Sequence, residues 1–144
     1  MSEIKVRLVE NDSELEQARD LRVKVFVVEQ NVPLEEEFDG LDDGALHAVA
    51  VMGGRVIGTG RLLENGHGEM KIGRMAVEEG LRRKGAGGLI LRFLEEQARQ
   101  RGAKEVMLHA QTYVKSFYKK HGYIEEGKPF IEANIEHIMM KKRL

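Results

Sequence analysis

Alternating apolar and polar residues predict a series of strands along the chain. Ile4, Val6 and Leu8 share one face of an extended segment over residues 4–9, which is the period of two expected of a half-buried strand. Similar patterns predict strands over residues 46–52, 55–63, 69–77, 105–110, 123–126 and 135–141. Gly53-Gly54 suits a tight turn between the first two of these, and residues 65–68 predict the next turn, so three consecutive strands form a meander.

Helical spacing of apolar residues predicts three helices between these strands. Ser13-x-x-Glu16 is typical of a capping box, and the apolar pattern that follows predicts a helix that ends before Pro33. Residues 89–98 form a second amphipathic pattern, with Gly102 at the position of a C-cap glycine, and residues 113–121 predict a short third helix. Strands and helices in this order predict a mixed α/β fold with helices covering the sheet.

Composition narrows the class of protein. The 144 residues fit one domain, residues 1–144, and no apolar run approaches the roughly 20 residues of a membrane span. The absence of cysteine excludes a disulfide framework, a thiolate metal site and a cysteine nucleophile. We expect a cytoplasmic protein without a membrane partner. The balance of 23 basic against 24 acidic residues, a net charge of −1, argues against a nucleic-acid partner.

A basic, glycine-rich loop lies between the predicted strand 69–77 and the helix that follows it. Its sequence is Arg82-Arg83-Lys84-Gly85-Ala86-Gly87-Gly88. Unpaired backbone N–H groups and the positive end of the dipole at a helix start favour phosphate, and glycines let phosphate oxygens approach. The loop lacks the Gly-Lys-Ser/Thr of a Walker loop, and Ile90 stands where the dinucleotide fingerprint has its third glycine. The sequence therefore predicts a pyrophosphate site of another kind.

Four segments resemble one enzyme superfamily. Arg82-x-x-Gly85-x-Gly87 is similar to the [Gln/Arg]-x-x-Gly-x-[Gly/Ala] loop of the GCN5-related N-acetyltransferase (GNAT) superfamily, and residues 117–123 resemble its Phe-Tyr-x-x-x-Gly-Phe segment. Residues 26–47 and 130–140 resemble the bacterial ElaA/YjcF branch, and the last segment also resembles glyphosate-acetylating relatives. The resemblance implies the GNAT fold, a mixed central sheet of about six to seven strands flanked by about four helices.

The resemblance also implies a cosubstrate, acetyl-CoA, and direct acetyl transfer to an amine in a ternary complex without a metal. The pyrophosphate would lie over the N–H groups of residues 83–88, and the pantetheine arm would pair with the backbone of residues 75–77. The N–H of Val77 would polarise the thioester carbonyl, where negative charge develops. The implied cofactor-binding residues are Met75, Ala76, Val77, Arg82, Arg83, Lys84, Gly85, Ala86, Gly87 and Gly88.

Two residues match catalytic positions of the family. Tyr118 matches the tyrosine that protonates the leaving sulfur, although a tyrosine in a short amphipathic helix can also be a packing residue. His137 matches the histidine proposed as base in the glyphosate-acetylating relatives, and histidine suits proton transfer near neutral pH. Glu136 stands where those relatives carry proline. Glu69 and a water chain are the competing routes for the amine proton.

The sequence gives less specific signals for the residues that would bind the acceptor amine than for those that would bind the cofactor. Resemblance to the ElaA/YjcF branch makes Glu29 and Gln30 candidate substrate-binding residues for a small-molecule or peptide amine. Residues 35–43 contain six carboxylates without the spacing of a calcium loop. We expect a solvated acidic loop, or one that favours a cationic amine. His109 is expected to be buried beside the cofactor channel, and relatives make a homodimer a further expectation.

Two other classes of function stay open. Gly85-Ala86-Gly87-Gly88 satisfies the Gly-x-x-Gly of an RNA-binding KH loop, but that loop joins two helices and residues 71–77 alternate as a strand. A coenzyme A-binding module without catalysis is the second alternative. The presence of Tyr118 and of a candidate base favours an enzyme, an N-acetyltransferase.

Overall fold

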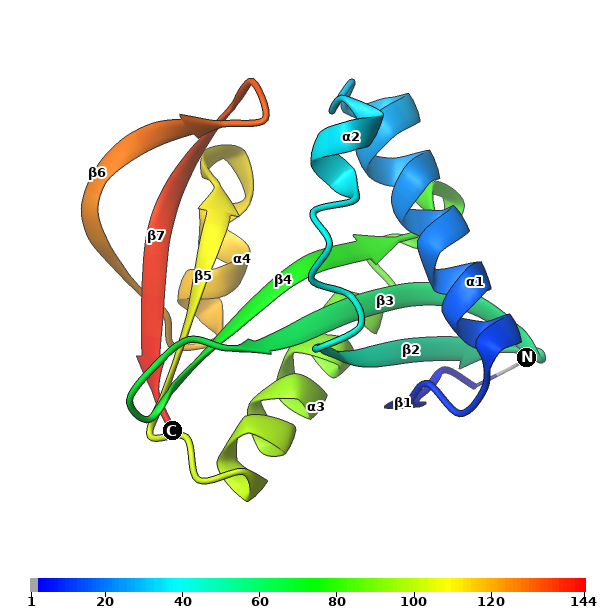
Figure 1. Ribbon diagram of the computed structural model, residues 1–144, viewed down its shortest axis with the longest axis horizontal. Helices are drawn as coiled ribbons and strands as arrows, with labels where there is room; N and C mark the ends of the chain where they lie inside the picture. The colour runs from blue at the N-terminus through cyan, green and yellow to red at the C-terminus, as the bar shows by residue number, and fades with distance from the viewer. Residues whose placement is uncertain (1–2) are drawn as a thin grey trace.

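A seven-stranded sheet forms the centre of the computed structural model, which describes residues 3–144 (Figure 1). Its strand order is β1-β2-β3-β4-β5-β7-β6, and neighbouring strands are antiparallel except for the parallel pair β4 and β5. The strands are β1 (Lys5–Leu8), β2 (Leu46–Met52), β3 (Arg55–Glu64), β4 (Glu69–Val77), β5 (Glu105–Gln111), β6 (Ile124–Glu132) and β7 (Ile135–Arg143).

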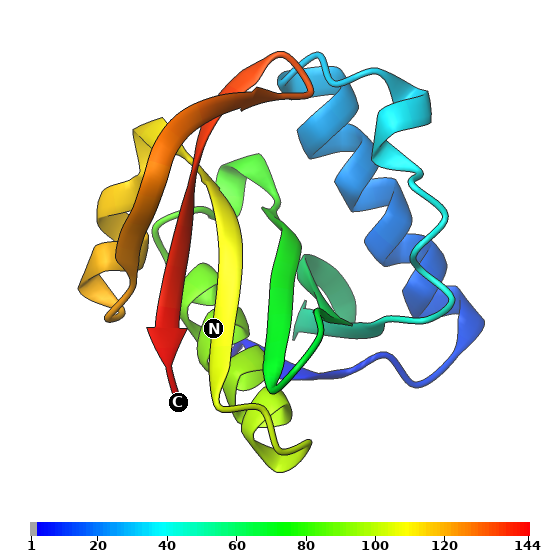
Figure 2. The ribbon, with the colours of Figure 1, turned by 60° about the vertical axis from the view of Figure 1, so that its left-hand side comes forward.

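Helices cover both faces of this sheet, as Figures 1 and 2 show from two sides. The four α-helices are α1 (Asp12–Arg22), α2 (Leu34–Glu37), α3 (Ala86–Gln100) and α4 (Lys115–Lys120). The main core forms between α3 and the sheet, and includes Ile90, Leu94 and Ile72. A smaller cluster of Ala18, Val49 and Val56 joins α1 to the other face. The predicted fold class is confirmed.

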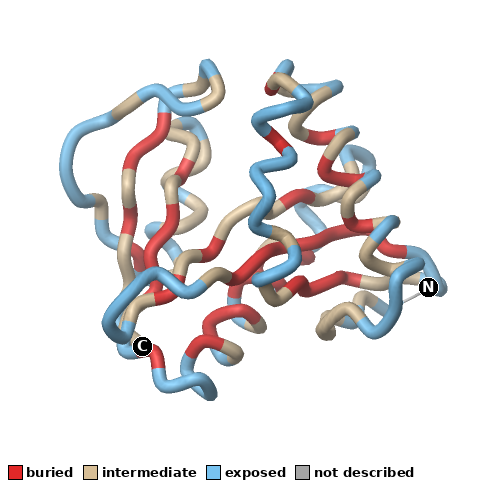
Figure 3. Tube along the Cα trace, viewed as in Figure 1, coloured by how far each residue is buried: buried red, intermediate tan, exposed pale blue. Residues whose placement is uncertain are grey.

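Two glycines let α3 approach β3 closely. A Cβ atom added at Gly60 would lie 2.8 Å from Ile90 Cγ2 and 2.8 Å from Leu94 Cδ1, and one at Gly58 would lie 2.9 Å from Ile90 Cδ1. Ile90 and Leu94 are fully buried, so neither can move aside without loss of packing. Figure 3 shows the continuous buried stretch of β3 above α3.

The first helix differs from the prediction at both ends. Its N-cap is Asn11, whose Oδ1 accepts a 2.9 Å hydrogen bond from the N–H of Glu14, so the predicted capping box at Ser13 is wrong by two residues. After Arg22 the helix widens into the π-helix η1 (Val23–Glu29). The N–H of Gln30 donates to the carbonyl of Val25, five residues back, which is the π-helical pattern.

Strands β4 and β5 separate soon after they start. They pair from Glu69 opposite Glu105 to Lys71 opposite Met107 and no further. On its other edge, β4 contains a bulge against β3 between Gly73 and Ala76, where Arg74 has a φ of 50°. Beyond Lys71, β4 therefore has no neighbouring strand on the side that faces β5 in the described chain.

In the last part of the sheet, β6 is longer than the predicted strand. β6 runs to Glu132, whereas the sequence pattern predicted a strand over residues 123–126 only. Its register with β7 shifts between Glu126 and Phe130, at Gly127 with a φ of 80°. The predicted third helix consists of a 3₁₀ turn, η3 (Thr112–Val114), followed by α4.

Within residues 3–144, no helix is long and apolar enough to cross a membrane.

The close contact between β3 and α3 generates a stability prediction. Gly60→Ala is expected to lower the free energy of unfolding by about 1–3 kcal/mol, because the new methyl group overlaps two buried side chains. Gly44→Ala is the matched control, since a Cβ there meets no atom within 4 Å. Urea unfolding followed by circular dichroism measures both. Equal stability of the two variants would contradict the close packing of α3.

Candidate active site

The glycine-rich loop connects β4 to α3 through the 3₁₀ turn η2 (Glu79–Leu81). Gly85 is the N-cap residue of α3 with a φ of 89°, and no side chain caps the helix. A Cβ at Gly88 would lie 3.3 Å from His121 Cε1, which is a tight approach, whereas one at Gly87 would make an ordinary contact of 3.5 Å with Phe117 Cζ. Glycine at position 88 therefore helps the end of α4 to pack beside the helix start. Because the loop follows a strand, it does not have the helix–loop–helix setting of a KH loop.

Arg82 does not point away from the protein. Its Nε donates to the carbonyl of Val77 at 2.9 Å, and its Nη atoms lie 2.9 and 3.0 Å from the two carboxylate oxygens of Glu29. The structure thus brings together a predicted cofactor residue and a predicted substrate residue. Arg83 and Lys84 are exposed.

The end of η1 is also tied to the end of β5. Gln111 Nε2 donates to Gln30 Oε1 at 2.8 Å, across the side of the sheet on which β4 and β5 have separated. Together with the pair between Glu29 and Arg82, this contact fixes the last turn of η1 to both the glycine-rich loop and β5. Glu29 and Gln30 therefore lie between the glycine-rich loop and the region in which β4 and β5 have separated.

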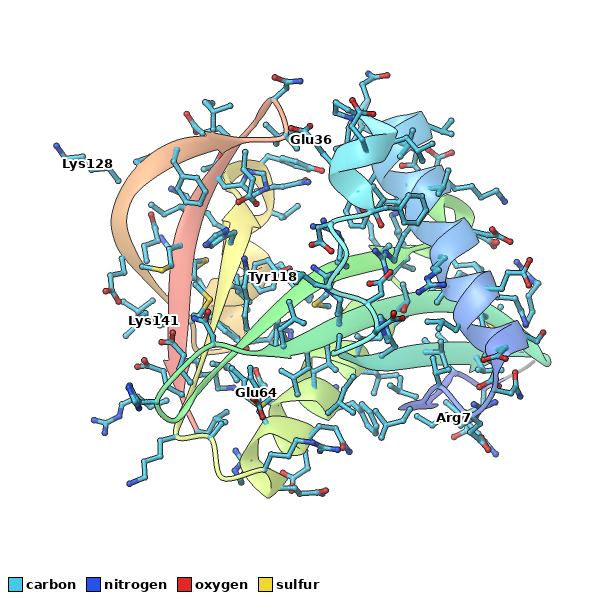
Figure 4. The ribbon with its side chains drawn as sticks, viewed as in Figure 1. Arg7, Glu36, Glu64, Tyr118, Lys128 and Lys141 are labelled. Carbon is cyan, nitrogen blue, oxygen red and sulfur yellow. The ribbon has the colours of Figure 1, made fainter. Side chains whose placement is uncertain are left out.

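Tyr118 reaches from α4 toward β4. Its hydroxyl lies 4.0 Å from Met75 Sδ, and Figure 4 shows the side chain between β5 and β4. The rings of Phe117 and Tyr123 contact it edge-on at 5.0 and 5.8 Å between centroids. Burial raises the pKa of Tyr118 to about 12. The phenol is therefore protonated across the physiological range and can donate a hydrogen bond near Met75.

His137 lies on β7 opposite Gln111 of β5 and Phe130 of β6. It is 7% exposed, and its Nδ1 lies 2.8 Å from the carbonyl oxygen of Ile135. Because a carbonyl only accepts hydrogen bonds, Nδ1 carries the proton in the neutral ring, which leaves the lone pair on Nε2. In the described part of the chain, no group is hydrogen-bonded to Nε2. The imidazole is thus oriented as a base.

His109 is only partly buried, with 24% of its side chain exposed, whereas the expectation was burial. Its Nδ1 lies 3.1 Å from Glu132 Oε2, and it shares the open face of the sheet with His137. The hydrogen bond with His109 lowers the pKa of Glu132 below its usual range. Sequence reasoning missed this pair because Glu132 lies beyond the predicted end of the strand.

The acidic loop is anchored by arginines, so the expectation that it is solvated is wrong for three of its carboxylates. Arg22 and Glu37 are each 1% exposed, with Arg22 Nε 2.5 Å from Glu37 Oε1. Arg61 pairs with Asp39 at 2.8 Å and with Asp42 at 3.1 Å. The missed signal was Arg22 itself, a charged residue on the apolar face of the predicted helix.

Arg74 connects this ionic network to the bulge in β4. Its Nε lies 3.1 Å from Glu37 Oε2 and its Nη2 lies 3.1 Å from Asp39 Oδ2. Nη2 also donates to the backbone carbonyls of Glu36 and Glu37. The positive φ at Arg74 therefore belongs to a residue whose side chain holds α2 and the loop after it against β4.

Pairing with arginine keeps Asp39 and Asp42 ionised. Burial alone would raise the pKa of Asp39, but hydrogen bonds from Arg61 and from the N–H of Leu41 hold it far below its usual value. The pKa of Asp42 is lowered in the same way, by Arg22 and Arg61 against the effect of burial. The loop is thus locally neutralised rather than strongly anionic.

Glu69, the competing candidate base, lies at the paired end of β4, opposite Glu105. Lys141 Nζ is 3.2 Å from its carboxylate, and Asn65 Nδ2 donates to it at 2.6 Å. Burial opposes these contacts, but the net effect is a pKa below the usual value. A carboxylate with a lowered pKa is a weaker base, so this environment does not suit amine deprotonation.

A family model described as an acetyltransferase (GNAT) domain matches residues 11–144. The chain belongs to the GNAT acetyltransferase family. Its sequence is 40% identical over 141 residues to the uncharacterized N-acetyltransferase YjcF of Bacillus subtilis, covering 96% of this chain and 99% of that protein. The predicted superfamily and its ElaA/YjcF branch are thereby confirmed, as is the prediction of an N-acetyltransferase.

Solved structures agree with this GNAT assignment. The crystal structure of Escherichia coli ElaA has a TM-score of 0.84 and 29% sequence identity, covering 99% of both chains. An acyl-CoA N-acyltransferase from Pseudomonas aeruginosa has a TM-score of 0.85 and 28% identity, again covering 99% of both chains. Within residues 3–144 of this GNAT protein, no three His, Cys, Asp or Glu side chains are grouped to hold a metal ion.

The ionic network generates a prediction on pH. Because the pKa of Asp39 is lower in the folded state than the ~3.9 of an unfolded chain, its carboxylate stabilises the fold above about pH 4, and this stability is lost as the pH falls further. Asp39→Asn is expected to cost about 1–3 kcal/mol at pH 7, and less at pH 2–3.

Urea unfolding over a pH series measures this difference. The control is Asp43→Asn, since that carboxylate is fully exposed and lies 4.0 Å from Arg19. If the free energies of unfolding of Asp39→Asn and of the parent protein changed with pH in parallel, the network would not stabilise the ionised carboxylate.

Proposed function

We propose that this GNAT protein transfers an acetyl group directly from acetyl-CoA to a primary amine in a ternary complex. The observation that supports this most strongly is the separation of β4 from β5 beside an uncapped, glycine-rich helix start, with the Tyr118 phenol between the two strands. This arrangement offers phosphate donors, a free strand edge and a hydrogen-bond donor in one continuous region.

The proposed cofactor residues fit the parts of acetyl-CoA, which supplies an activated acetyl group when bound. Backbone N–H groups of residues 83–88 would hold the pyrophosphate at the positive end of α3, and exposed Arg83 and Lys84 would add charge. The backbone of Met75, Ala76 and Val77 would pair with the pantetheine arm, and the Val77 N–H would polarise the thioester carbonyl. Arg82 fixes the adjoining peptide unit, since its Nε donates to the Val77 carbonyl.

His137 would act as the general base that accepts a proton from the substrate ammonium. The substrate ammonium, with a pKa near ~10, must lose a proton before it can attack. The oriented lone pair of His137 Nε2 suits that step, whereas the ion-paired Glu69 does not.

Tyr118 would act at the leaving sulfur as a hydrogen-bond donor. With a pKa of about 12, the phenol is a weaker acid than a thiol, whose pKa is ~8.5. Complete proton transfer from Tyr118 to the thiolate would therefore be unfavourable, and donation of a hydrogen bond as charge develops is the role that its burial favours.

Three expectations about the whole molecule remain predictions. These are a single domain over residues 1–144, a cytoplasmic location and a homodimer. The acceptor is predicted to be a small-molecule or peptide amine.

The decisive experiment measures release of the coenzyme A thiol from acetyl-CoA against a panel of primary amines, with mass spectrometry of the products. Acetylation of at least one amine, with the amine mass raised by one acetyl group, is the expected result. Tight binding of acetyl-CoA without acetylation of any amine would instead favour the non-catalytic coenzyme A-binding module.

Substitution of Tyr118 tests its role at the sulfur. Tyr118→Phe keeps the ring contacts and removes the hydroxyl, so kcat is expected to fall about 10²-fold while the Kd for acetyl-CoA changes less than about threefold. Steady-state kinetics and calorimetry measure the two quantities. Equal turnover by variant and parent would leave Tyr118 as a packing residue only.

Substitution of His137 tests the assignment of the base. His137→Ala is expected to lower kcat about 10²-fold near pH 7, with partial recovery at high pH, where the free amine forms without help. His67→Ala, at an exposed turn residue, is the control. A pH–rate profile of the same shape as the parent's would reject His137 as the base.

A further inference from the structure

The open face of β5, β6 and β7 carries a row of ring side chains that ends at a carboxylate. Phe130 contacts His109 edge-on at 5.0 Å and stacks on His137 at 5.9 Å with 21° between the rings. Glu132, two residues further along β6, accepts the hydrogen bond of His109 Nδ1. An aromatic face and an anion thus lie beside the proposed base.

Glu132 differs from the other carboxylates of this face. Lys141 Nζ lies within 4.0 Å of carboxylate oxygens of Glu69, Glu105 and Glu126. Within residues 3–144, Glu132 is paired with His109 alone, through one of its two oxygens, and its side chain is 47% exposed. Lys71 and His137 are the other charged or titratable groups near it. One carboxylate oxygen is therefore available to a ligand.

A second observation points to a ligand at this place. His137 is more than nine-tenths buried, yet in the described chain its Nε2 is hydrogen-bonded to nothing. Nε2 is not one of the fully buried atoms without a partner, so it can be reached from the open face, and the Phe130 ring and the Ile135 carbonyl fix its orientation. The position next to Nε2 suits an N–H group of an incoming molecule.

The strand register places the two features on one face of the hairpin. Phe130 lies opposite His137, and Glu132 lies opposite Ile135, so these side chains share one side of the sheet. His109 contacts both Phe130 and Glu132, so a carboxylate lies beside the rings that flank His137, and a short diamine is the class of acceptor that could contact both.

We propose that Glu132 and Phe130 bind a second cationic group of the acceptor, which is therefore a diamine or a similar amine with two positive charges. This inference rests on the proposed transfer reaction. His137 Nε2 takes one proton from the reacting ammonium. The freed nitrogen forms the amide bond as the carbon–sulfur bond breaks, and its second proton ends on the coenzyme thiol. The distant ammonium stays charged between the Glu132 carboxylate and the Phe130 ring.

A pair of probe amines of equal length tests this assignment. Cadaverine and n-pentylamine differ by one ammonium group, so the parent enzyme is expected to favour cadaverine in kcat/KM by at least about fivefold, a preference that declines with added salt. Glu132→Gln retains an acceptor for His109 and loses the charge. It is expected to remove the preference without changing the Kd for acetyl-CoA.

Glu125→Gln is the matched control, since Glu125 lies on the same strand but pairs with Lys115 and Lys119 near α4. Loss of the preference in Glu132→Gln and its retention in Glu125→Gln would support the site. Equal use of both amines by the parent enzyme, or a preference that survives Glu132→Gln, would overturn the inference and leave the transfer reaction standing. Acetylation of neither amine by enzyme that binds acetyl-CoA in calorimetry would overturn the inference and also count against transfer.

Discussion

The short ladder between β4 and β5 is the constraint on which the rest of the site depends. After three residue pairs, the backbone groups on one edge of β4 need partners other than a strand, because buried N–H and C=O groups are rarely left unpaired. The bulge at Arg74, the contact of Gln30 with Gln111 and the approach of Tyr118 to Met75 all lie around this opening. The chain thus keeps the two strands apart and, within the described residues, leaves the edge of β4 beyond Lys71 without a strand partner.

The ionic network links this opening to α2 and to the loop that follows it. Arg74 belongs to the bulge of β4, and its guanidinium contacts Glu37 and Asp39 of α2 and its loop. Buried ion pairs add little net stability compared with apolar packing, but removal of one partner is costly. This network therefore defines one arrangement of strand and loop, so that β4 and the loop after α2 are held at a fixed distance.

Local patterns in the sequence predicted most of the fold, and the errors have a common cause. The Gly53-Gly54 turn, the limits of β4 and the start of β7 follow from local chemistry and were predicted correctly. The π-helix η1 and the anchored acidic loop depend on partners distant in sequence, such as Arg22 with Glu37. The placement of Tyr118 and His137 came from family resemblance, and only the structure supplied the tautomer of His137 and the exposure of His109.

The outer strand β6 has a consequence for assembly. An unprotected edge strand is a template for pairing with another chain, but the register of β6 shifts between Glu126 and Phe130, where Gly127 has a positive φ and Pro129 has no N–H to donate. A second copy therefore cannot extend the sheet by a continuous ladder along β6. Side-chain packing between surfaces, rather than a shared sheet through the middle of this edge, would have to join two copies.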